Sequence, residues 1–565
     1  MIKNGEYEGL VEGLGTDGEG IIKKEGATVF VPFCLVGERV RFKVLKVKGN
    51  IAYGKLLNIL SPSDKRVSPP CPVFGKCGGC DLQHTDYSSQ LDFKRESVSS
   101  ALKKIGGISA EVEPTVASEK TYGYRNKISL PIGVDAEGKT VVGFYARRSH
   151  RIVQTDTCAI QSGWAADVIS AVKVYIRDSG LKGYNEVTGS GELRHLVVRE
   201  VKGAFIVALV AAKAVNAAPL IAELEKVFKN FTFLININTN PTNAIFGEEW
   251  RVLRGEGFFA AEEFGIKYSA GANTFLQVND GVRGKLYSRV LEEVPAGATV
   301  IDAYSGGGML TAMLAKKCGK AYGIEIVAEA SRCADELKDK NGLECKMFNI
   351  CGKVEDEIES VLKKTDGTRV IVCDPPRKGM ERSVVRSIAE ADAEKIILIS
   401  CNPATLARDL GLILNTLEET DGALAKNPAP DSKYKVESIT PFDMFPQTKW
   451  CETLVVLSHK KPDGHINIKV EFGEEEGQVS LKEVAKRAEE RKPKDKVTYK
   501  MIQEYIEKTY GFKVHTAYIA EVKRDLGLPM YDAPNAVEEL KRPRAHPTTK
   551  MVDAIKETLK HFEIV

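Results

Sequence analysis

The clearest pattern along the chain is a set of short apolar runs that each stop abruptly at a polar or glycine-rich turn. Four runs share it: 299–303, 321–324, 370–373 and 396–399. Apolar runs of this length, bounded by turn residues, are typical of the buried strands of a parallel sheet. In open α/β sheets the carboxyl ends of the strands lie beside the crevice where ligands bind. The pattern therefore predicts an α/β fold whose functional residues follow these strands.

The last two runs each deliver a reactive group to that edge. Cys401 comes where the run 396–399 gives way to the polar turn Ser400-Cys401-Asn402-Pro403, so its thiol is expected to face the crevice. A buried structural cysteine is the alternative, because free cysteines are often buried. Asp374 follows the run 370–373, and Pro375 and Pro376 stiffen the loop behind it. Both residues are candidates for chemistry at one site.

The first two runs suggest a nucleoside cofactor. Three glycines, 306–308, precede an expected helix at 309–314, and glycine lets a ligand approach the backbone closely. Glu325 follows Asp302 by 23 positions, a spacing at which a carboxylate can bind a ribose diol. The chain lacks the lysine-containing phosphate loop GxxxxGK[ST]. These features favour a nucleoside without a polyphosphate.

The first 60 residues predict a small barrel, because they are rich in glycine and β-branched residues and include a strand at 28–31. In the stretch 39–44, cations alternate with apolar residues, which would place three cations on one face of a strand. Such a face suits RNA, although an ordinary solvated strand looks the same.

Three cysteines follow the linker Pro69-Pro70. Cys71, Cys77 and Cys80 lie within ten residues, and two glycines between the last two allow a tight turn. This spacing indicates a metal site. Zinc and iron–sulfur clusters both use four ligands, so a fourth must come from elsewhere in the chain.

Several later stretches mix cations with aromatic residues. The stretches 122–127 and 143–150 have this composition, which suits stacked, unpaired RNA bases but also occurs on ordinary surface strands. The stretch 191–199 is a further candidate for an RNA-facing edge. Its His195, taken alone, is more often a structural residue.

Composition sets the outer bounds. The 565 residues suggest three or four domains, and a hydrophobic content of 43% is ample for packed cores. A net charge of +3 means that any RNA affinity comes from local patches. The chain shows no apolar signal run and no span of 18 uncharged apolar residues, so a cytoplasmic location without membrane attachment is expected. Twelve cysteines in such a protein are expected to be thiols or metal ligands.

The carboxyl-terminal part is helical in pattern after an expected linker at 473–477. Thr498 and Thr516 are the expected caps of two helices, ended by Gly511 and Gly527, with the spacing of a helix-turn-helix. Residues 461–565 hold 20 Lys and Arg against 19 Asp and Glu, which excludes a polybasic tail. Either docking on the rest of the protein or RNA binding through Lys523, Arg524 and the stretch 541–544 fits this pattern.

Three motifs resemble those of the S-adenosylmethionine-dependent RNA uracil-C5 methyltransferases. They are DPPRKG at 374–379, SCNPATLARDL at 400–410, and DMFPQT at 443–448 followed by Glu452. The resemblance covers about residues 1–459. The amino-terminal region and the cysteine cluster resemble the branch of this family that modifies 23S ribosomal RNA. The resemblance implies a class I (Rossmann-like) α/β methyltransferase domain, an OB-type TRAM barrel, a central α+β iron–sulfur domain and, beyond it, a small helical domain. The expected bounds are 1–60 for the barrel, 61–92 and 125–262 for the central domain, 93–124 and 263–459 for the methyltransferase domain, and 470–565 for the helical domain.

The resemblance also implies roles for individual residues. Cys401 matches the nucleophile and Glu452 the general base. The matched contacts of S-adenosylmethionine are Gln277, Tyr304, Glu325 and Asp374. Cys71, Cys77, Cys80 and the distant Cys158 match the ligands of a [4Fe–4S] cluster. One departure is Trp450, which stands in place of a usual histidine two residues before Glu452.

The chemistry implied is methyl transfer to carbon 5 of an unpaired or flipped uridine in 23S ribosomal RNA, with Cys401 adding to carbon 6. Transfer RNA is the alternative substrate, and an iron–sulfur RNA-binding protein without catalysis is the alternative class. A monomer is expected. Nothing in the local sequence identifies the group that favours the Cys401 thiolate.

Overall fold

The computed structural model describes residues 1–420, 423–460, 499–526 and 546–562, and the chain divides into two compact units, Met1–Gly464 and His465–Val565. The linker expected at 473–477, the cap Thr498, Gly527 and the basic stretch 541–544 lie outside the described residues. No helix in the described ranges has both the length and the apolar character needed to cross a membrane.

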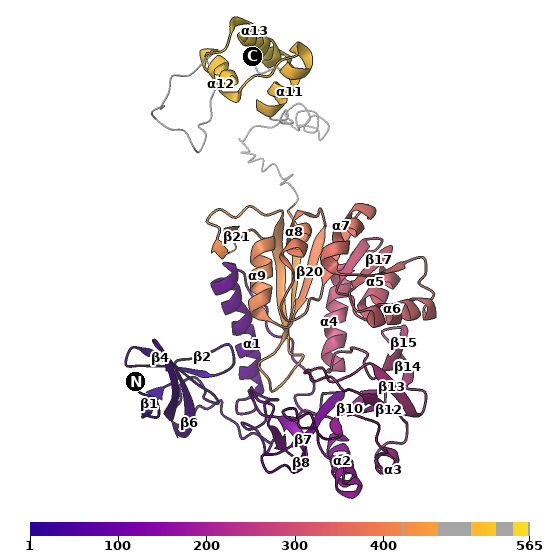
Figure 1. Ribbon diagram of the computed structural model, residues 1–565. Coiled ribbons are helices and arrows are strands. Elements are labelled where there is room, and N and C mark those ends of the chain that lie inside the picture. Colours follow the sequence, from indigo (N-terminus) through magenta and orange to yellow (C-terminus); the bar gives the residue numbers. More distant parts are fainter. Residues whose placement is uncertain (421–422, 461–498, 527–545, 563–565) are drawn as a thin grey trace, which may run out of the picture. The chain divides into compact units, whose positions relative to one another are not determined.

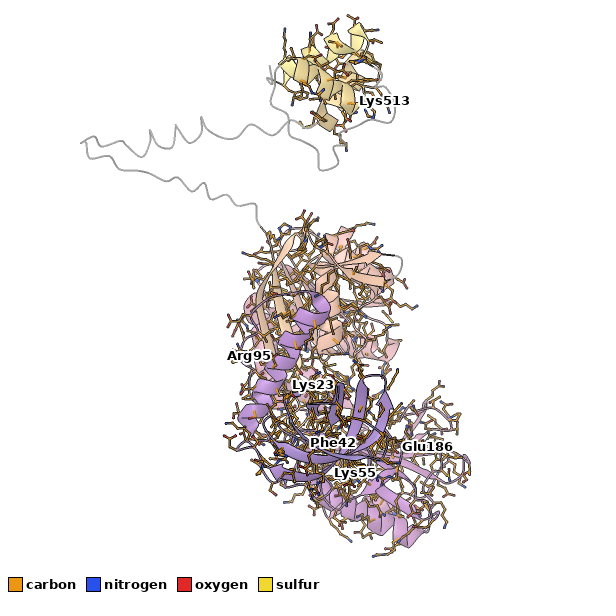
Figure 2. The ribbon with its side chains drawn as sticks, turned by 90° about the vertical axis from the view of Figure 1, so that its left-hand side faces the viewer. Lys23, Phe42, Lys55, Arg95, Glu186 and Lys513 are labelled. Atoms are coloured by element: carbon orange, nitrogen blue, oxygen red, sulfur yellow. The ribbon has the colours of Figure 1, made fainter. Side chains whose placement is uncertain are left out.

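The first unit begins with a six-stranded sheet of order β1-β5-β6-β4-β3-β2 (Figure 1). Its strands are β1 (Glu6–Leu10), β2 (Gly13–Leu14), β3 (Gly20–Lys24), β4 (Ala27–Val31), β5 (Arg39–Lys48) and β6 (Ile51–Ser61). The alternation predicted for β5 is confirmed, because Val40 and Phe42 are buried while Arg39 and Arg41 are exposed. Figure 2 shows Phe42 within this sheet and the exposed Lys23 and Lys55 on two of its strands.

A seven-stranded sheet, here called the central sheet, has the order β13-β12-β11-β10-β7-β8-β9. Its elements are β7 (Lys127–Val134), β8 (Thr140–Tyr145), β9 (Ile152–Gln154), α2 (Ala165–Ser179), β10 (Leu193–Val201), β11 (Ala204–Ala211), α3 (Ala218–Glu225), β12 (Phe231–Ile237) and β13 (Glu249–Arg254). Apolar residues of α2 and α3 pack against β10, β11 and β12 in one core. A hairpin of β14 (Phe258–Glu263) and β15 (Ile266–Gly271) follows.

A second seven-stranded sheet, here called the main sheet, has the order β18-β17-β16-β19-β20-β24-β23, and the α/β fold predicted from the apolar runs is confirmed. Its strands are β16 (Thr299–Ala303), β17 (Lys320–Glu325), β18 (Met347–Cys351), β19 (Arg369–Cys373), β20 (Lys395–Ser400), β23 (Tyr434–Phe442) and β24 (Glu452–His459). The first five in spatial order are parallel, and β24 and β23 are antiparallel to their neighbours.

Helices cover both faces of the main sheet (Figure 1). One face packs against α4 (Asp280–Glu293), α5 (Met309–Lys317) and α6 (Ala328–Lys340). The other packs against α1 (Tyr87–Ala101), the π-helical turn η1 (Leu102–Gly106), α7 (Val354–Lys364), α8 (Arg382–Glu390) and α9 (Pro403–Ile413). A small hairpin, β21 (Leu417–Thr420) with β22 (Ala423–Lys426), completes the unit.

The described helices of the second unit are α11 (Tyr499–Tyr510), α12 (Thr516–Asp525) and α13 (Thr549–His561), which share one apolar core. The end of the first helix at Gly511 is confirmed, since Gly511 has a φ of 74°. The predicted cap of the second helix is wrong by one residue: His515 is the N-cap, because its ring nitrogen accepts the Ala517 N–H at 3.2 Å. The sequence analysis missed α13, whose Ala554, Ile555 and Leu559 complete the core.

Candidate active site

Five of the predicted site residues lie along one edge of the main sheet. In spatial order, Glu325 ends β17, Tyr304 follows β16, Asp374 follows β19, Cys401 follows β20, and Glu452 begins β24. Because β24 is antiparallel to β20, its first residue lies at the edge where β20 ends. The last pair of that ladder is Ser400 with Thr453, so Cys401 and Glu452 each lie one residue beyond it on neighbouring strands.

Local sequence fixes the position of Cys401. The apolar strand β20 ends at Ser400, and α9 begins two residues later, where the Asn402 side chain accepts the Ala404 N–H at 3.1 Å. Pro403 suits the first turn of that helix, because the missing N–H is not needed there. The thiol is thus held in the turn between strand and helix, half-buried at the sheet edge.

The electrostatic surroundings of Cys401 are mixed. Burial is the main cause that raises the pKa of its thiol to about 11, and the nearby Glu452 and Asp374 carboxylates add to this. The Arg377 guanidinium opposes the shift through its charge and a hydrogen bond. Arg377 is therefore the cation that favours the thiolate.

Two carboxylates act on this thiol, the buried Glu452 and the half-buried Asp374. Burial raises the pKa of Asp374 to about 7. Burial also raises the pKa of Glu452 well above its usual value, the charge of Asp374 raises it further, and Arg377 lowers it. A carboxylate whose pKa lies nearer to neutrality is a stronger base than an exposed one, which suits proton removal.

Arg377 is held from two sides. Its carbonyl oxygen accepts hydrogen bonds from the Asn402 side-chain amide at 3.1 Å and from the Thr405 hydroxyl at 3.3 Å, which ties the loop after β19 to the start of α9. Its guanidinium lies 4.6 Å from the centre of the Trp450 ring, a cation–π contact. Trp450, the residue that departs from the family pattern, therefore packs on the cation beside Cys401.

The chain of contacts continues to the amino-terminal barrel. Lys449 Nζ lies 4.6 Å from the Trp450 ring centre and donates to the Asp17 carboxylate at 2.5 Å. Asp17 lies in the turn between β2 and β3, and it also accepts from Arg148 at 2.6 Å. The barrel thus contacts the loop that leads into Glu452.

The other end of the edge carries the features expected of a nucleoside site. The Glu325 carboxylate accepts the Gly306 N–H at 2.9 Å and the Val327 N–H at 2.7 Å, which fixes its orientation. Since a carboxylate has about four acceptor sites, it retains capacity for hydroxyl groups of a ligand. Tyr304 has a φ of 68°, a strained value that side-chain-bearing residues adopt mainly at functional sites.

Gly308 has a backbone conformation that requires glycine, as expected for the glycine turn at 306–308. Its φ is 78°, and an added Cβ would lie 2.7 Å from the Cβ of Ala334 on α6. Only glycine therefore lets α5 start this close to α6.

Gln277 lies in the loop between β15 and α4 and is buried. Its carbonyl oxygen accepts from the Asn126 amide at 3.2 Å. Two residues later, the Asn279 amide donates to the Ser118 hydroxyl at 3.0 Å and the Met444 carbonyl at 3.4 Å. These bonds tie the loop of Gln277 to the segment that precedes Glu452, but Gln277 itself does not lie at a strand end.

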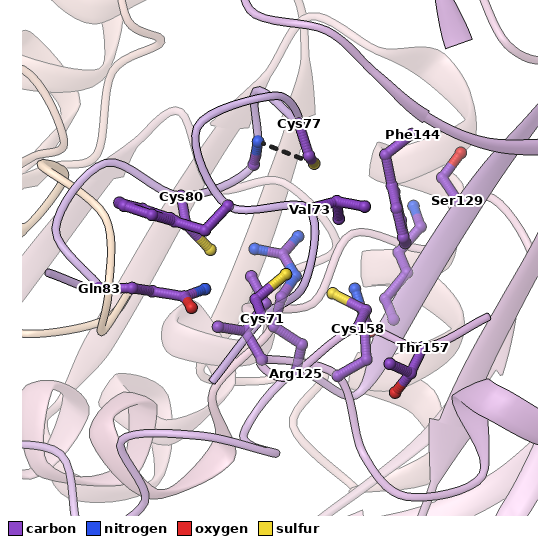
Figure 3. A pocket seen from close by; sticks show the side chains of 15 residues that line it. Cys71, Val73, Cys77, Cys80, Gln83, Arg125, Ser129, Phe144, Thr157 and Cys158 are labelled. Atoms are coloured by element: carbon purple, nitrogen blue, oxygen red, sulfur yellow. Dashed lines mark hydrogen bonds between the residues drawn. The ribbon is translucent and has the colours of Figure 1, made fainter. Parts of the chain in front are cut away.

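The four predicted metal ligands form a separate site. Cys71, Cys77, Cys80 and Cys158 line one cavity of about 220 Å³, here called the thiol cavity (Figure 3). The first three lie on the loop between β6 and α1, and Cys158 lies between β9 and α2. Among the described residues, no three or more His, Cys, Asp or Glu side chains stand close enough together to hold a single metal ion. The cavity between the thiols leaves room for a larger group.

A glycine makes the thiol loop possible. Gly78 donates its N–H to the Tyr145 carbonyl at 2.9 Å, and an added Cβ would lie 3.0 Å from the backbone of Arg147. Burial raises the pKa of Cys80, and the charges of the other three thiols add to the shift. The thiols are therefore close enough to repel one another once ionised.

Sequence reasoning missed Arg377 as a functional residue. Its signal was present, because Arg377 lies three positions after Asp374 within the motif at 374–379. Its distance to Cys401 in sequence hid the relationship, which exists only because β19 and β20 are neighbours.

Comparison with known proteins agrees with this arrangement. A family model described as tRNA (Uracil-5-)-methyltransferase matches residues 357–460, and a TRAM domain model matches residues 4–57. The first match covers Asp374, Arg377, Cys401 and Glu452.

Two curated relatives are named as uncharacterised RNA methyltransferases. The one from Clostridium acetobutylicum is 38% identical over 80% of this chain and 97% of its own length. The one from Halalkalibacterium halodurans is 37% identical over 81% of this chain and 98% of its own length. The crystal structure of Pyrococcus abyssi tRNA (uracil-54, C5)-methyltransferase with S-adenosyl-L-homocysteine is 25% identical, with a TM-score of 0.62 over 80% of this chain and 99% of that one. The chain belongs to the S-adenosylmethionine-dependent RNA uracil-C5 methyltransferases.

Proposed function

We propose that the protein methylates carbon 5 of a specific uridine in 23S ribosomal RNA through a covalent adduct with Cys401. The observation that carries this is the meeting of one thiol, two carboxylates and one guanidinium at the edge of the main sheet, beside a site suited to a nucleoside. A thiol and a base at one site are needed because carbon 5 of uracil is too weak a nucleophile to take a methyl group unaided.

S-adenosylmethionine supplies the methyl group when bound. Glu325 is oriented to accept from the ribose hydroxyls, while Tyr304, Gln277 and Asp374 would contact the rest of the molecule. The exposed Ile326 and Val327 follow Glu325 and offer apolar surface for a base.

The first step needs the Cys401 thiolate. The thiol loses its proton to solvent, and the adjacent Arg377 stabilises the resulting charge. The sulfur then forms a bond to carbon 6, and the electrons of the carbon 5–carbon 6 double bond make carbon 5 nucleophilic. Carbon 5 forms a bond to the methyl carbon as the bond from that carbon to the sulfonium sulfur breaks.

The last step needs a base. Glu452 takes the proton from carbon 5, the double bond re-forms, and the bond from carbon 6 to the Cys401 sulfur breaks to release the thiolate. Burial and the charge of Asp374 raise the pKa of Glu452, which makes its carboxylate a stronger base than an exposed one.

The RNA must present an unpaired base to this edge, because ring atoms in a stacked duplex are out of reach. The exposed Arg39 and Arg41 on β5 are candidate phosphate contacts of the TRAM domain, although both also pair with Glu8. A cytoplasmic monomer fits this role.

The thiol cavity suits a [4Fe–4S] cluster, which Cys71, Cys77, Cys80 and Cys158 would hold. The donor set is right, since iron–sulfur clusters are held by four thiolates. A positively charged iron centre would also relieve the repulsion among the four thiolates. Asp81 links this loop to the active site, because its N–H donates to the Gln447 carbonyl at 3.0 Å. The cluster would thus support the segment before Glu452 without entering the chemistry.

Transfer RNA is the second candidate substrate. It is favoured by the Pyrococcus abyssi neighbour, which is a transfer RNA enzyme. The ribosomal substrate is favoured by the cysteine cluster, which the resemblance ties to the 23S-modifying branch.

Base-resolved mapping of 5-methyluridine separates the two. RNA from cells with and without the protein is compared, and loss of the modification at one 23S position is expected. Loss at a transfer RNA position instead would assign the second substrate, and no change in either RNA would overturn the proposal.

A further inference from the structure

Two stretches with the sequence of candidate RNA-facing segments, 143–150 and 191–199, meet at a cavity remote in sequence from the catalytic motifs. The cavity measures about 170 Å³ and is here called the aromatic cavity. Its walls include Tyr145, His150, Tyr184, Glu186, Arg194 and His195. The loop that carries Glu186 is exposed at its tip, where Val187 is 94% accessible, and Figure 2 shows Glu186 at the periphery of the central sheet. The cavity is therefore reachable by a large partner.

Four ring side chains contribute to the walls. Tyr145 lies 5.3 Å from His150 and 6.5 Å from His195, measured between ring centres. Tyr184 comes from the loop on the other side and carries the Arg194 guanidinium 4.5 Å from its ring centre. Rings arranged around one space are what a flat heterocycle needs for stacking.

The polar groups of the cavity are held in place. The Arg194 guanidinium donates to the carbonyls of Asn238 at 2.8 Å and Asn240 at 2.7 Å, so its position is fixed before any ligand binds. The Glu186 carboxylate lies 2.5 Å from His150 Nδ1 and accepts from the Tyr145 hydroxyl at 3.5 Å. It retains acceptor sites for an N–H group.

His195 adds a polar ring to the wall of the cavity. Its Nδ1 atom is buried and has no hydrogen-bond partner among the described residues. Burial lowers the pKa of its ring to about 4, so the ring is neutral near pH 7. A buried polar atom without a partner is costly unless a ligand or water satisfies it.

A line of cations joins this cavity to the active site. Arg147 and Arg148 lie two and three positions after Tyr145, and Arg148 pairs with Asp17, which also binds Lys449. Lys449 and Arg377 both pack on Trp450, and Arg377 lies beside Cys401. An RNA strand that places its target uridine at Cys401 would find these cations along its phosphates on the way to the aromatic cavity.

We propose that the aromatic cavity binds a second unpaired base of the same RNA and so fixes which uridine reaches Cys401. This rests on the proposed function. A cavity of about 150 Å³ accommodates benzene, so this one has room for the single ring of a pyrimidine. Glu186 would accept from an N–H group of the base, while Tyr184 and Tyr145 would stack on its faces.

The test pairs protein variants with RNA lacking single bases. A 23S fragment that contains the target uridine is made with one abasic position at a time, and its affinity for the full-length protein is measured. Base–aromatic stacking implies that one abasic position outside the target weakens wild-type binding by about five- to hundredfold. Tyr184→Ala should weaken binding to the intact fragment by a similar factor. This variant should bind the intact fragment and the fragment with that abasic position equally well.

Two further variants keep the test decisive. Tyr184→Phe retains the ring and should bind the RNA with wild-type affinity. If affinity is lost in Tyr184→Ala but kept in Tyr184→Phe, the loss comes from the missing ring. Glu137→Gln makes the same charge change as Glu186→Gln on the exposed turn between β7 and β8 and serves as the control. Glu186→Gln should weaken binding while Glu137→Gln should not.

The outcomes separate this inference from the proposed function. If wild-type protein forms 5-methyluridine in the fragment but no abasic position couples to Tyr184, the aromatic cavity does not bind a base and this inference fails alone. If no 5-methyluridine forms in ribosomal fragments while transfer RNA is methylated, the 23S assignment fails, and the same abasic scan on transfer RNA decides the cavity.

Discussion

Cys401 lies at the end of a buried strand, whereas Cys71, Cys77, Cys80 and Cys158 lie on loops around the thiol cavity. Burial raises the pKa of Cys401 and of Cys158 to the same value, about 11. The two sites differ in what surrounds the sulfur. Arg377 and two carboxylates act on Cys401, while the charged neighbours of Cys77, Cys80 and Cys158 are other thiols.

This difference teaches that partners, more than burial, assign a thiol its role. A thiolate beside a guanidinium and a base can add to a substrate and leave again. Four thiolates that repel one another are stabilised by a shared cationic centre.

Cys401→Ala should reduce methyl transfer to background while S-adenosylmethionine binding stays intact, because no other group supplies the nucleophile. Incorporation of labelled methyl into RNA and calorimetric binding of the cofactor measure the two. Cys351→Ala is the matched control, since Cys351 is an exposed thiol at the end of β18 on the same sheet. Normal turnover by Cys401→Ala would sink the mechanism.

Glu452→Gln should slow turnover by about two to four orders of magnitude, the usual contribution of a general base. Elimination then lacks its base, so a covalent protein–RNA adduct should accumulate, visible as a shifted band on a denaturing gel. The double variant Cys401→Ala/Glu452→Gln should show no adduct. An adduct that persists in the double variant contradicts the assignment of the nucleophile.

Arg377→Met should slow the reaction by about ten- to hundredfold, the worth of a hydrogen bond to a charged group. Removing the cation raises the pKa of Cys401 further, so less thiolate is present at a given pH and the rate should go on rising to higher pH than in wild type. A pH–rate profile under single-turnover conditions measures this. Lys378→Met is the control, because Lys378 is exposed and pairs with Glu381. An unchanged profile in Arg377→Met would assign thiolate stabilisation elsewhere.

Cys158→Ala should lose the cluster, whereas Cys401→Ala should keep it, which separates the two kinds of thiol directly. Wild-type protein purified without oxygen should be brown and contain iron and sulfide. Methylation by Cys158→Ala should fall less than in the active-site variants, because the proposed cluster would support the segment before Glu452 only from outside. Stoichiometric zinc without iron or sulfide would contradict the assignment of an iron–sulfur cluster.

Removing residues 470–565 should have the smallest effect. Cofactor binding should be preserved, and the slope of log affinity against log salt should fall by about 0.9 for each phosphate that the shortened protein no longer neutralises. Lys523 is one candidate contact to such a phosphate. Its Nζ atom lies 5.5 Å from the Tyr499 ring centre within the helical unit. An unchanged affinity and slope would leave the module a docking role only.

The apolar runs were enough to predict the main sheet and the edge at which its functional residues lie. Strands β19 and β20 are buried beyond their first residues, and a strand covered on both faces has to be a continuous apolar run. β16 departs from this pattern, because it contains the buried Asp302, whose carboxylate accepts the Thr311 hydroxyl. That constraint is local, and the order of residues alone therefore placed Glu325, Asp374 and Cys401 at strand ends. The turn at Gly308 was equally predictable, because its positive φ demands glycine.

The partners of these residues were decided only by tertiary structure. Arg377 reaches Cys401 because β19 and β20 pair, and Glu452 reaches it because β24 adds antiparallel to β20. Strand order is set by the packing of helices on the sheet, which no local pattern encodes. The sequence determined which reactive side chains are present, and the order of the strands in the sheet determined which of them lie close together.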